Sequence, residues 1–235
     1  MLNLTENQWD RVAQADQRAT GGRCVLVAIA GGSGAGKTRL ARQLEAALDP
    51  DTTVLALDDF YRDFSQLPVA ARERVNFDDP EALDWNLVSK VLKRCRAGLS
   101  VRIPRYDFVT HTRRSEGRRI IPRGVVIVEG LWALLKPEVR ALFDFRIFLE
   151  CPARVRLERR VVRDVAERGR DAGSARRQFR ERVAPMHNRF VEPQAHWADL
   201  VLNQAPTSHG IEYLANRFRA MADEPRVADL EEVLA

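Results

Sequence analysis

The segment GGSGAGKT at residues 31–38 constrains the fold of this chain more than any other feature. It satisfies the pattern G-x-x-x-x-G-K-[ST], a glycine-rich loop whose backbone N–H groups surround phosphate. It follows the apolar run RCVLVAIA, which predicts a strand buried on both faces, and precedes RLARQLEAAL, which has apolar residues at helical spacing. A strand, this loop and a helix in that order predict a P-loop nucleotide site.

Each residue type in the loop suits a nucleoside triphosphate. The glycines let the backbone approach the phosphates at the N-terminus of a helix, where anions are favoured. We expect Lys37 to neutralise the β- and γ-phosphates and Thr38 to ligate Mg²⁺ through its hydroxyl. A dinucleotide fold is disfavoured, because Lys37 stands where G-x-G-x-x-G would have its last glycine. The residues expected to bind the phosphates are Gly31, Gly32, Ser33, Gly34, Ala35, Gly36, Lys37 and Thr38.

Strand and helix patterns alternate along the rest of the chain. Strands are predicted at residues 53–57, 124–130, 145–150 and 199–203, and helices at 85–98, 136–143, 152–170, 174–193 and 209–222. Apolar strands that alternate with helices predict an α/β fold: a P-loop nucleoside triphosphate hydrolase-type parallel sheet covered by helices on both faces. We expect Asp84 to cap the helix at 85–98 and Pro185 to interrupt the helix at 174–193.

The length of 235 residues fits one domain over residues 1–222, followed by a C-terminal tail at 223–235. Within it, residues 62–122 form an insertion that contains VRIPRYDFVTHTRRSEGRRIIP, which predicts irregular strands or a hairpin with a turn at Gly117. Thr5 and Gln8 form a capping-box pattern that predicts a short N-terminal helix.

Composition argues against several classes of protein. No apolar run approaches the ~20 residues of a membrane span, and the N-terminus lacks the apolar region of a secretory signal. Cys24, Cys95 and Cys151 are far apart, which argues against disulfides and a zinc site. We therefore expect a cytoplasmic protein with no membrane partner.

Positive charge is concentrated in one segment. The whole chain has 38 basic and 33 acidic residues, and residues 154–189 hold twelve arginines against five acids. Phosphate and nucleic acid are the partners that such a surplus favours. The interleaved acids, and the lack of a nucleic-acid motif, favour phosphate. Arg154, Arg156 and Arg159 are expected to lie on a solvated face of their helix.

Two predicted strands end in carboxylates. Asp58 or Asp59 follows the strand at 53–57, and Glu129 ends the strand at 124–130, so both are delivered to the edge where ligands of such sheets bind. A carboxylate there can deprotonate an acceptor hydroxyl or hold Mg²⁺. The chain lacks the D-x-x-G and N-K-x-D motifs of a GTPase. These observations predict a small-molecule kinase.

Seven segments carry a resemblance to a known family. They are AGGSGAGKT, DDFYRD, NFDDPEALD, IPRYDFVTHTR, IVEGLWAL, RLERRVVRDVAERGR and VEPQAHWADLVLN, in this order over residues 24–203. On these motifs the chain resembles the uridine/cytidine kinase family, which is related to phosphoribulokinase and type I pantothenate kinase. The resemblance implies transfer of a phosphate from ATP or GTP to the 5′-hydroxyl of uridine or cytidine, the first step of pyrimidine salvage. It also suggests a homotetramer or dimer.

The resemblance implies roles around the reacting phosphate. Asp58 falls on the catalytic carboxylate, with Tyr61 nearby, and Tyr61 is expected to bind the substrate. Glu129 falls on the glutamate that helps to hold Mg²⁺ together with Thr38 and Asp58. Asp59 departs from the pattern, since the family usually has Ser or Thr there. The added charge could perturb the catalytic acid or face solvent.

The same resemblance places the acceptor. Asp78 falls on the aspartate that binds the ribose hydroxyls, and Tyr106, Phe108 and His111 fall on the base pocket. Aromatic rings can stack on a pyrimidine, and a histidine can donate to or accept from its edge.

The arginine-rich helix is implied to close as a lid, formed by residues 153–190. Arg163 is expected to act in catalysis and Arg168 to bind the nucleotide, while Arg160, Arg170 and Gln178 are expected to bind the acceptor. Guanidinium groups suit this role because they match phosphate oxygens and stay charged when buried.

Three alternative functions are compared with this prediction. A kinase of the same fold could use another acceptor, such as pantothenate, ribulose 5-phosphate or nicotinamide riboside. The basic helices could instead serve a nucleic-acid-binding ATPase, although nucleic acid is not the partner we predict. A regulatory nucleotide-binding module is disfavoured, because both candidate carboxylates are present.

Overall fold

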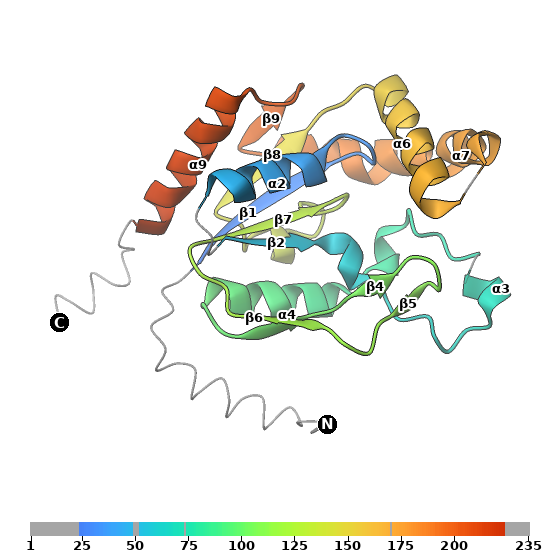
Figure 1. The fold of residues 1–235 in the computed structure, drawn as a ribbon, viewed down its shortest axis with the longest axis horizontal. Helices are drawn as coiled ribbons and strands as arrows, with labels where there is room; N and C mark the ends of the chain where they lie inside the picture. The colour runs from blue at the N-terminus through green and yellow to red at the C-terminus, as the bar shows by residue number, and fades with distance from the viewer. Residues whose placement is uncertain (1–23, 49–51, 73, 170, 224–235) are drawn as a thin grey trace.

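The computed structural model describes residues 24–48, 52–72, 74–169 and 171–223. The predicted N-terminal helix, Arg170 and nearly all of the predicted tail lie outside these ranges. The described residues form a five-stranded parallel sheet in the order β2–β7–β1–β8–β9 (Figure 1). Its strands are β1 (Val25–Gly31), β2 (Thr53–Ala56), β7 (Val125–Gly130), β8 (Phe145–Leu149) and β9 (Leu200–Leu202). The predicted parallel α/β sheet is therefore confirmed.

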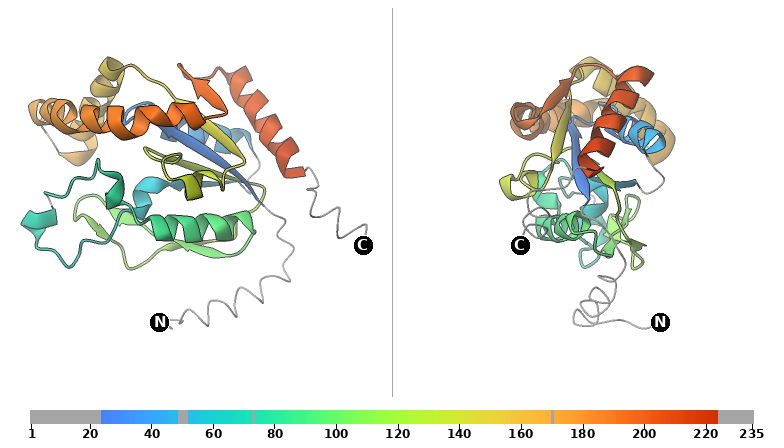
Figure 2. Two further views of the ribbon diagram at one scale, coloured as in Figure 1. Left: turned by 180° about the vertical axis from the view of Figure 1, so that it is seen from behind. Right: turned by 90° about the vertical axis from the view of Figure 1, so that its left-hand side faces the viewer.

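The central strands are buried on both faces because helices cover both. Every residue of β1 and of β7 is buried. On one face, Val25, Val27 and Ile29 pack against α2 (Lys37–Ala47) and α9 (Ser208–Asp223). On the other face, Leu26 and Ala28 belong to a core with α4 (Trp85–Arg96) and the segment after β7. Figure 2 shows the sheet between these layers.

Helix ends follow the predicted signals in α4. The Asp84 side chain accepts a hydrogen bond from the backbone N–H of Leu87 at 3.1 Å, and the chain leaves the helix through Gly98 at φ 65°. The predicted helix at 136–143 is shorter, since α5 covers only Pro137–Arg140. β2 ends at Ala56, and the 3₁₀ helix η1 (Leu57–Phe60) follows it directly.

The insertion forms two small antiparallel pairs. They are β3 (Val101–Ile103) with β6 (Arg118–Ile120), and β4 (Tyr106–Asp107) with β5 (Thr112–Arg113). Of the two predicted alternatives, irregular strands agree with these short pairs. The turn predicted at Gly117 is wrong, because the chain reverses between β4 and β5, where His111 has φ 54°. Gly117 instead lies beside Ile103, where a Cβ would be 2.6 Å from the Ile103 carbonyl oxygen. A short helix α3 (Val69–Arg72) and the 3₁₀ helix η2 (Pro80–Ala82) precede these strands.

The arginine-rich segment is almost continuously helical. It consists of α6 (Ala153–Arg168), α7 (Ala172–Gln178), η3 (Phe179–Val183), α8 (Ala184–Met186), η4 (His187–Val191) and η5 (Glu192–Trp197). The interruption predicted at Pro185 is wrong, since π-helical turns lie before and after it and the backbone stays helical. The wider turns accommodate a residue that has no N–H and would clash with a regular preceding turn. No helix in the described ranges is both long and apolar enough to cross a membrane.

Candidate active site

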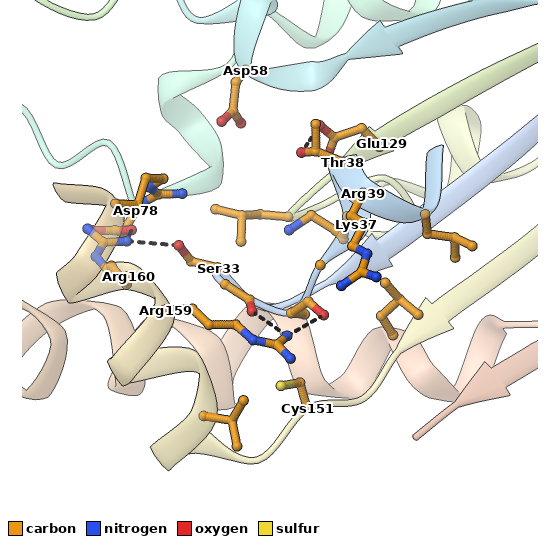
Figure 3. A pocket seen from close by; sticks show the side chains of 18 of the residues that line it. Ser33, Lys37, Thr38, Arg39, Asp58, Asp78, Glu129, Cys151, Arg159 and Arg160 are labelled. Carbon is orange, nitrogen blue, oxygen red and sulfur yellow. Dashed lines mark hydrogen bonds and ion pairs between the residues drawn. The ribbon is translucent and has the colours of Figure 1, made fainter. Parts of the chain in front are cut away.

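A large pocket lies at the carboxyl ends of the central strands, as expected for this class of sheet. Its volume is about 980 Å³. The P-loop, η1, the insertion and α6 all contribute to its lining, and Figure 3 shows part of it. In Figure 1 the α3, β4 and β5 elements of the insertion lie at the same end of the sheet as α6 and α7. The pocket thus joins the predicted donor and acceptor regions in one space.

The P-loop wraps the N-terminus of α2. Gly34 and Gly36 adopt φ 80° and 104°, conformations that favour glycine. Lys37 is 9% exposed, and its Nζ donates to the carbonyl oxygen of Gly32 at 3.0 Å. Burial lowers the pKa of Lys37, while the nearby carboxylates of Glu129 and Asp58 act to raise it. The ammonium group therefore lies within a buried charge cluster at the base of the pocket.

The two predicted carboxylates come from neighbouring strands. Parallel pairing sets Glu129 of β7 opposite Ala56, two residues before Asp58. Glu129 accepts a hydrogen bond from the Thr38 hydroxyl at 2.7 Å, and burial raises the pKa of its carboxyl group. Figure 3 shows Asp58 facing Thr38 and Lys37 across the pocket.

These donors fit Mg²⁺. The ion prefers oxygen ligands and usually binds through one or two carboxylates together with substrate phosphates. Thr38 and Glu129 provide a hydroxyl and a carboxylate that are joined by a hydrogen bond, and Asp58 adds a second carboxylate to the lining of the same pocket. Among the described residues, no group of three or more His, Cys, Asp or Glu side chains could hold a metal ion. The donor set therefore suits a metal that arrives with a phosphate.

Asp59 is turned toward the insertion. It is half-buried, and its Oδ1 accepts a hydrogen bond from the backbone N–H of Tyr106 at 3.3 Å. Burial raises the pKa of its carboxyl group, and the neighbouring charge of Asp58 adds to this. The sequence left two possibilities for Asp59, a charge that perturbs the catalytic acid or a charge that faces solvent. The contact with Tyr106 does not fit the second possibility.

The predicted base-pocket residues belong to one aromatic cluster. His111 stacks on Phe77 with ring centroids 4.5 Å apart and an interplanar angle of 17°. Tyr106 contacts the rings of Tyr61 and Phe108 at centroid distances of 5.3 and 5.4 Å. Phe108 and His111 line the pocket, whereas Tyr106 is buried behind them.

Phe77 is a member of this cluster that sequence reasoning missed. It also lines the pocket, and its carbonyl oxygen accepts from the Tyr61 hydroxyl at 2.8 Å. A signal existed, since Phe77 stands in the NFDDPEALD segment next to Asp78. Its contacts with Tyr106 and His111 are long-range and leave no periodic pattern.

Arg160 joins three parts of the site. Its Nη1 donates to the Ser33 hydroxyl at 3.1 Å and lies 3.9 Å from the Asp78 carboxylate. Its Nη2 donates to the Gln178 amide oxygen at 3.1 Å. The structure thus brings together a P-loop residue and the predicted acceptor residues Asp78, Arg160 and Gln178 (Figure 3 shows Ser33, Asp78 and Arg160).

The remaining predicted lid arginines differ in what the structure describes. Arg163 lines the pocket and donates to the Asp164 carboxylate. The side chain of Arg168 and the whole of Arg170 lie outside the described residues.

The solvated face predicted for the first arginines of this helix is partly wrong. Arg154 is exposed, as expected, and pairs with Glu158. Arg156 is 3% exposed and donates to the Cys151 carbonyl oxygen at 2.9 Å. Arg159 is exposed but donates to the carbonyl oxygens of Gly34 and Ala35 at 3.3 and 3.4 Å. The carbonyl groups of Gly34 and Ala35 lie beside α6 because of the fold of the P-loop, and helical periodicity in the sequence could not reveal this contact.

His187 of η4 is a second residue that sequence reasoning missed. A Cβ at Gly32 would lie 3.0 Å from His187 Cε1 and 2.7 Å from Arg156 Cδ, so both side chains pack directly on the P-loop. Burial and the positive charges of Arg156 and Lys37 lower the pKa of His187 to about 4. The contact joins segments about 150 residues apart, and no sequence pattern signals it.

Comparison with known proteins agrees with this arrangement. The model of the phosphoribulokinase / uridine kinase family matches residues 26–209, which include the P-loop, both carboxylates, the insertion and α6. The chain belongs to this family. It is therefore an ATP-dependent phosphotransferase with the P-loop kinase fold.

Individual relatives cover most of the chain. A uridine kinase from Halobacterium salinarum is 35% identical over 84% of this chain and 88% of its own length. One from Deinococcus deserti is 39% identical over 77% of this chain and 87% of its own length. The structure of phosphoribulokinase from Rhodobacter spheroides superimposes with a TM-score of 0.56 at 15% identity, over 81% of this chain and 74% of that one. The last similarity concerns the fold alone.

Proposed function

We propose that this enzyme transfers the γ-phosphate of ATP or GTP to the 5′-hydroxyl of uridine or cytidine. The observation that carries the proposal is a single pocket that is lined by a P-loop, a strand-end carboxylate and members of an aromatic cluster. The P-loop suits a phosphate donor, and the flat rings suit a planar base. Similarity to uridine kinases at 35–39% identity supports the same acceptor.

The donor half of the pocket positions and neutralises phosphate. Backbone N–H groups of residues 32–38 and the Lys37 ammonium would bind the β- and γ-phosphates. Thr38, Glu129 and Asp58 would hold Mg²⁺, which when bound supplies positive charge to the phosphate oxygens. Phosphoryl transfer depends mainly on such positioning and charge compensation.

The acceptor half orients the nucleoside. Phe77, Phe108 and His111 offer ring faces and edges to the base, and the Asp78 carboxylate can accept hydrogen bonds from ribose hydroxyls. Asp58 accepts the proton of the 5′-hydroxyl as that oxygen attacks the γ-phosphorus. The bond from the γ-phosphorus to the bridging oxygen then breaks, and ADP or GDP leaves with both electrons. Arg163 lines the same pocket and would donate to the transferred group.

An acceptor panel tests the proposal. Release of ADP from ATP, and then of GDP from GTP, is measured with uridine, cytidine, pantothenate, ribulose 5-phosphate and nicotinamide riboside as acceptors. We expect uridine or cytidine to give the highest kcat/KM. A higher value for any other acceptor would transfer the proposal to that kinase reaction. Stimulation by DNA or RNA but not by nucleosides would overturn the kinase assignment.

Two further expectations rest on the sequence and not on the pocket. We expect the enzyme to work in the cytoplasm and to assemble as a homotetramer or dimer.

A further inference from the structure

Asp164 is a carboxylate inside an arginine-rich helix. Its side chain is fully buried, with an exposed fraction of 0%. Buried carboxylates are rare unless their charge is compensated and their oxygens accept hydrogen bonds. The compensation here comes from arginines that line or border the pocket, so the role of Asp164 bears on the reaction.

The two carboxylate oxygens contact different arginines. Oδ1 accepts from Arg163 Nε at 3.2 Å and from Arg163 Nη2 at 3.0 Å. Oδ2 lies 3.4 Å from Arg160 Nε. The i, i+4 spacing sets Arg160 and Asp164 on the same side of α6. One carboxylate therefore controls the orientation of two guanidinium planes.

For Arg163 the contact fixes one edge of the guanidinium group. Nε and Nη2 both donate to Asp164, so the orientation of the plane, and with it the direction of the Nη1 donors, is set. Arg163 lines the pocket, and its charge is close enough to Lys37 to act on the pKa of that ammonium group. A guanidinium group that is held along one edge is already oriented to donate hydrogen bonds to a phosphate oxygen, and its side chain does not have to change rotamer first.

For Arg160 the Asp164 carboxylate is one of several polar neighbours. Its other donors contact Ser33 and Gln178, and Asp78 lies at 3.9 Å. Without the negative charge of Asp164, the buried Arg160 and the partly exposed Arg163 would lose the carboxylate that they share, and their mutual repulsion would favour other rotamers. Arg160 would then lose its alignment between the P-loop and the acceptor side.

We propose that Asp164 is a positioning residue that orients Arg163 toward the transferred phosphate and Arg160 toward the acceptor. The proposal rests on the proposed phosphotransfer, because its effects are measured in that reaction. The competing role is a structural one, in which Asp164 only stabilises α6. A structural role predicts lower stability but no dependence on the identity of residue 163.

The experiment is a double-mutant cycle with a matched control. Asp164→Asn keeps the size of the side chain and removes its charge. Glu158→Gln makes the same change on the exposed face of α6, where Glu158 pairs with Arg154 at 3.1 Å. Each variant is assayed for kcat, for KM of both substrates and for Tm. We expect Asp164→Asn to lower kcat by about 30- to 100-fold, as for a misplaced catalytic group, and Glu158→Gln to stay within about twofold.

The cycle decides between positioning and structural roles. In an Arg163→Ala background, Asp164→Asn is expected to lower kcat by less than about threefold further, because its main target is gone. Equal losses in both backgrounds, or a kcat unchanged by Asp164→Asn, would overturn the proposal. If Asp164→Asn does not fold, Asp164→Glu takes its place, since it keeps the charge but displaces the carboxylate by one methylene. Asp164→Glu must likewise lower kcat more when Arg163 is present than in the Arg163→Ala background.

The cycle is run with whichever acceptor the wild-type enzyme phosphorylates. A failure of the pyrimidine nucleoside assignment therefore shows in the acceptor panel, and a failure of the positioning role shows in the cycle.

Discussion

His187 makes the stability of this enzyme depend on pH in a defined window. Burial and the charges of Arg156 and Lys37 lower its pKa from 6.5 to about 4. In the unfolded chain a histidine titrates near pH ~6.5, so below that pH the unfolded state binds more protons than the folded state. Stability is then complete above about pH 6.5 and is lost as the pH falls toward about 4.

The size of the effect follows from the two pKa values. The full difference corresponds to at most about 3–4 kcal/mol, and about 2 kcal/mol of it is expressed at pH ~5. His187 retains some exposure to solvent, which screens the charge and makes these values upper limits. Even about 1 kcal/mol is a measurable part of the stability of a domain.

Urea unfolding between about pH 7.5 and about pH 5 measures this contribution. The wild-type protein is compared with His187→Gln, which cannot titrate, and with His209→Gln, which alters an exposed histidine on α9. We expect the wild type and His209→Gln to lose about 1–2 kcal/mol more than His187→Gln over this range. Equal losses in all three proteins would refute the role assigned to His187, because carboxylate titration is common to them.

Three further predictions concern the site. Asp58→Asn should lower kcat by about 100-fold or more with ATP binding intact, whereas Asp59→Asn should act less; ADP-release kinetics with the reverse order would identify Asp59 as the catalytic acid. His111→Ala should raise KM for the nucleoside about tenfold and leave KM for ATP nearly unchanged, an expectation contradicted by equal losses for both. Gly32→Ala places a Cβ 2.7 Å from Arg156 Cδ and should weaken ATP binding about tenfold, as measured by calorimetry. Unchanged ATP affinity would contradict this prediction and would mean that the Arg156 side chain moves aside at no cost.

The parts of the molecule that sequence could predict are those set by short-range patterns. The apolar runs at β1 and β7 and the capping aspartate at α4 depend on neighbours a few residues away. Once these elements form a parallel sheet, the pairing of β7 with β2 brings Glu129 and Asp58 to one edge. The sequence alone therefore predicts the approximate position of these carboxylates.

The parts that could not be predicted depend on contacts between distant segments. Phe77 stacks on His111 across 34 residues, and Asp59 accepts from Tyr106 across 47 residues. Pro185 should end a helix by local rules, yet π-helical turns on both sides keep the backbone helical. Tertiary packing determines each of these features, and the structural preferences of single residues do not predict that packing.

The arginines of α6 also depend on contacts that the sequence does not show. So many arginines on one α-helix suggest a single charged surface, but their partners divide them into three groups. Arg154 pairs with Glu158 in solvent, Arg156 and Arg159 bind carbonyl oxygens beside or within the P-loop, and Arg160 and Arg163 converge on Asp164.

The division has a consequence for the predicted lid. Arg156, Arg159 and Arg160 tie the first half of α6 to residues 32–35 and 151 by packing and hydrogen bonds, so this half belongs to the phosphate site itself. A lid over residues 153–190 that closes as one body would have to break all of these contacts. Closure that keeps them would begin after Arg163, near Gly169, where the helix ends with φ 63°. We therefore expect the first part of α6 to keep its contacts with the P-loop, and any closure of the predicted lid to involve the segments that follow it.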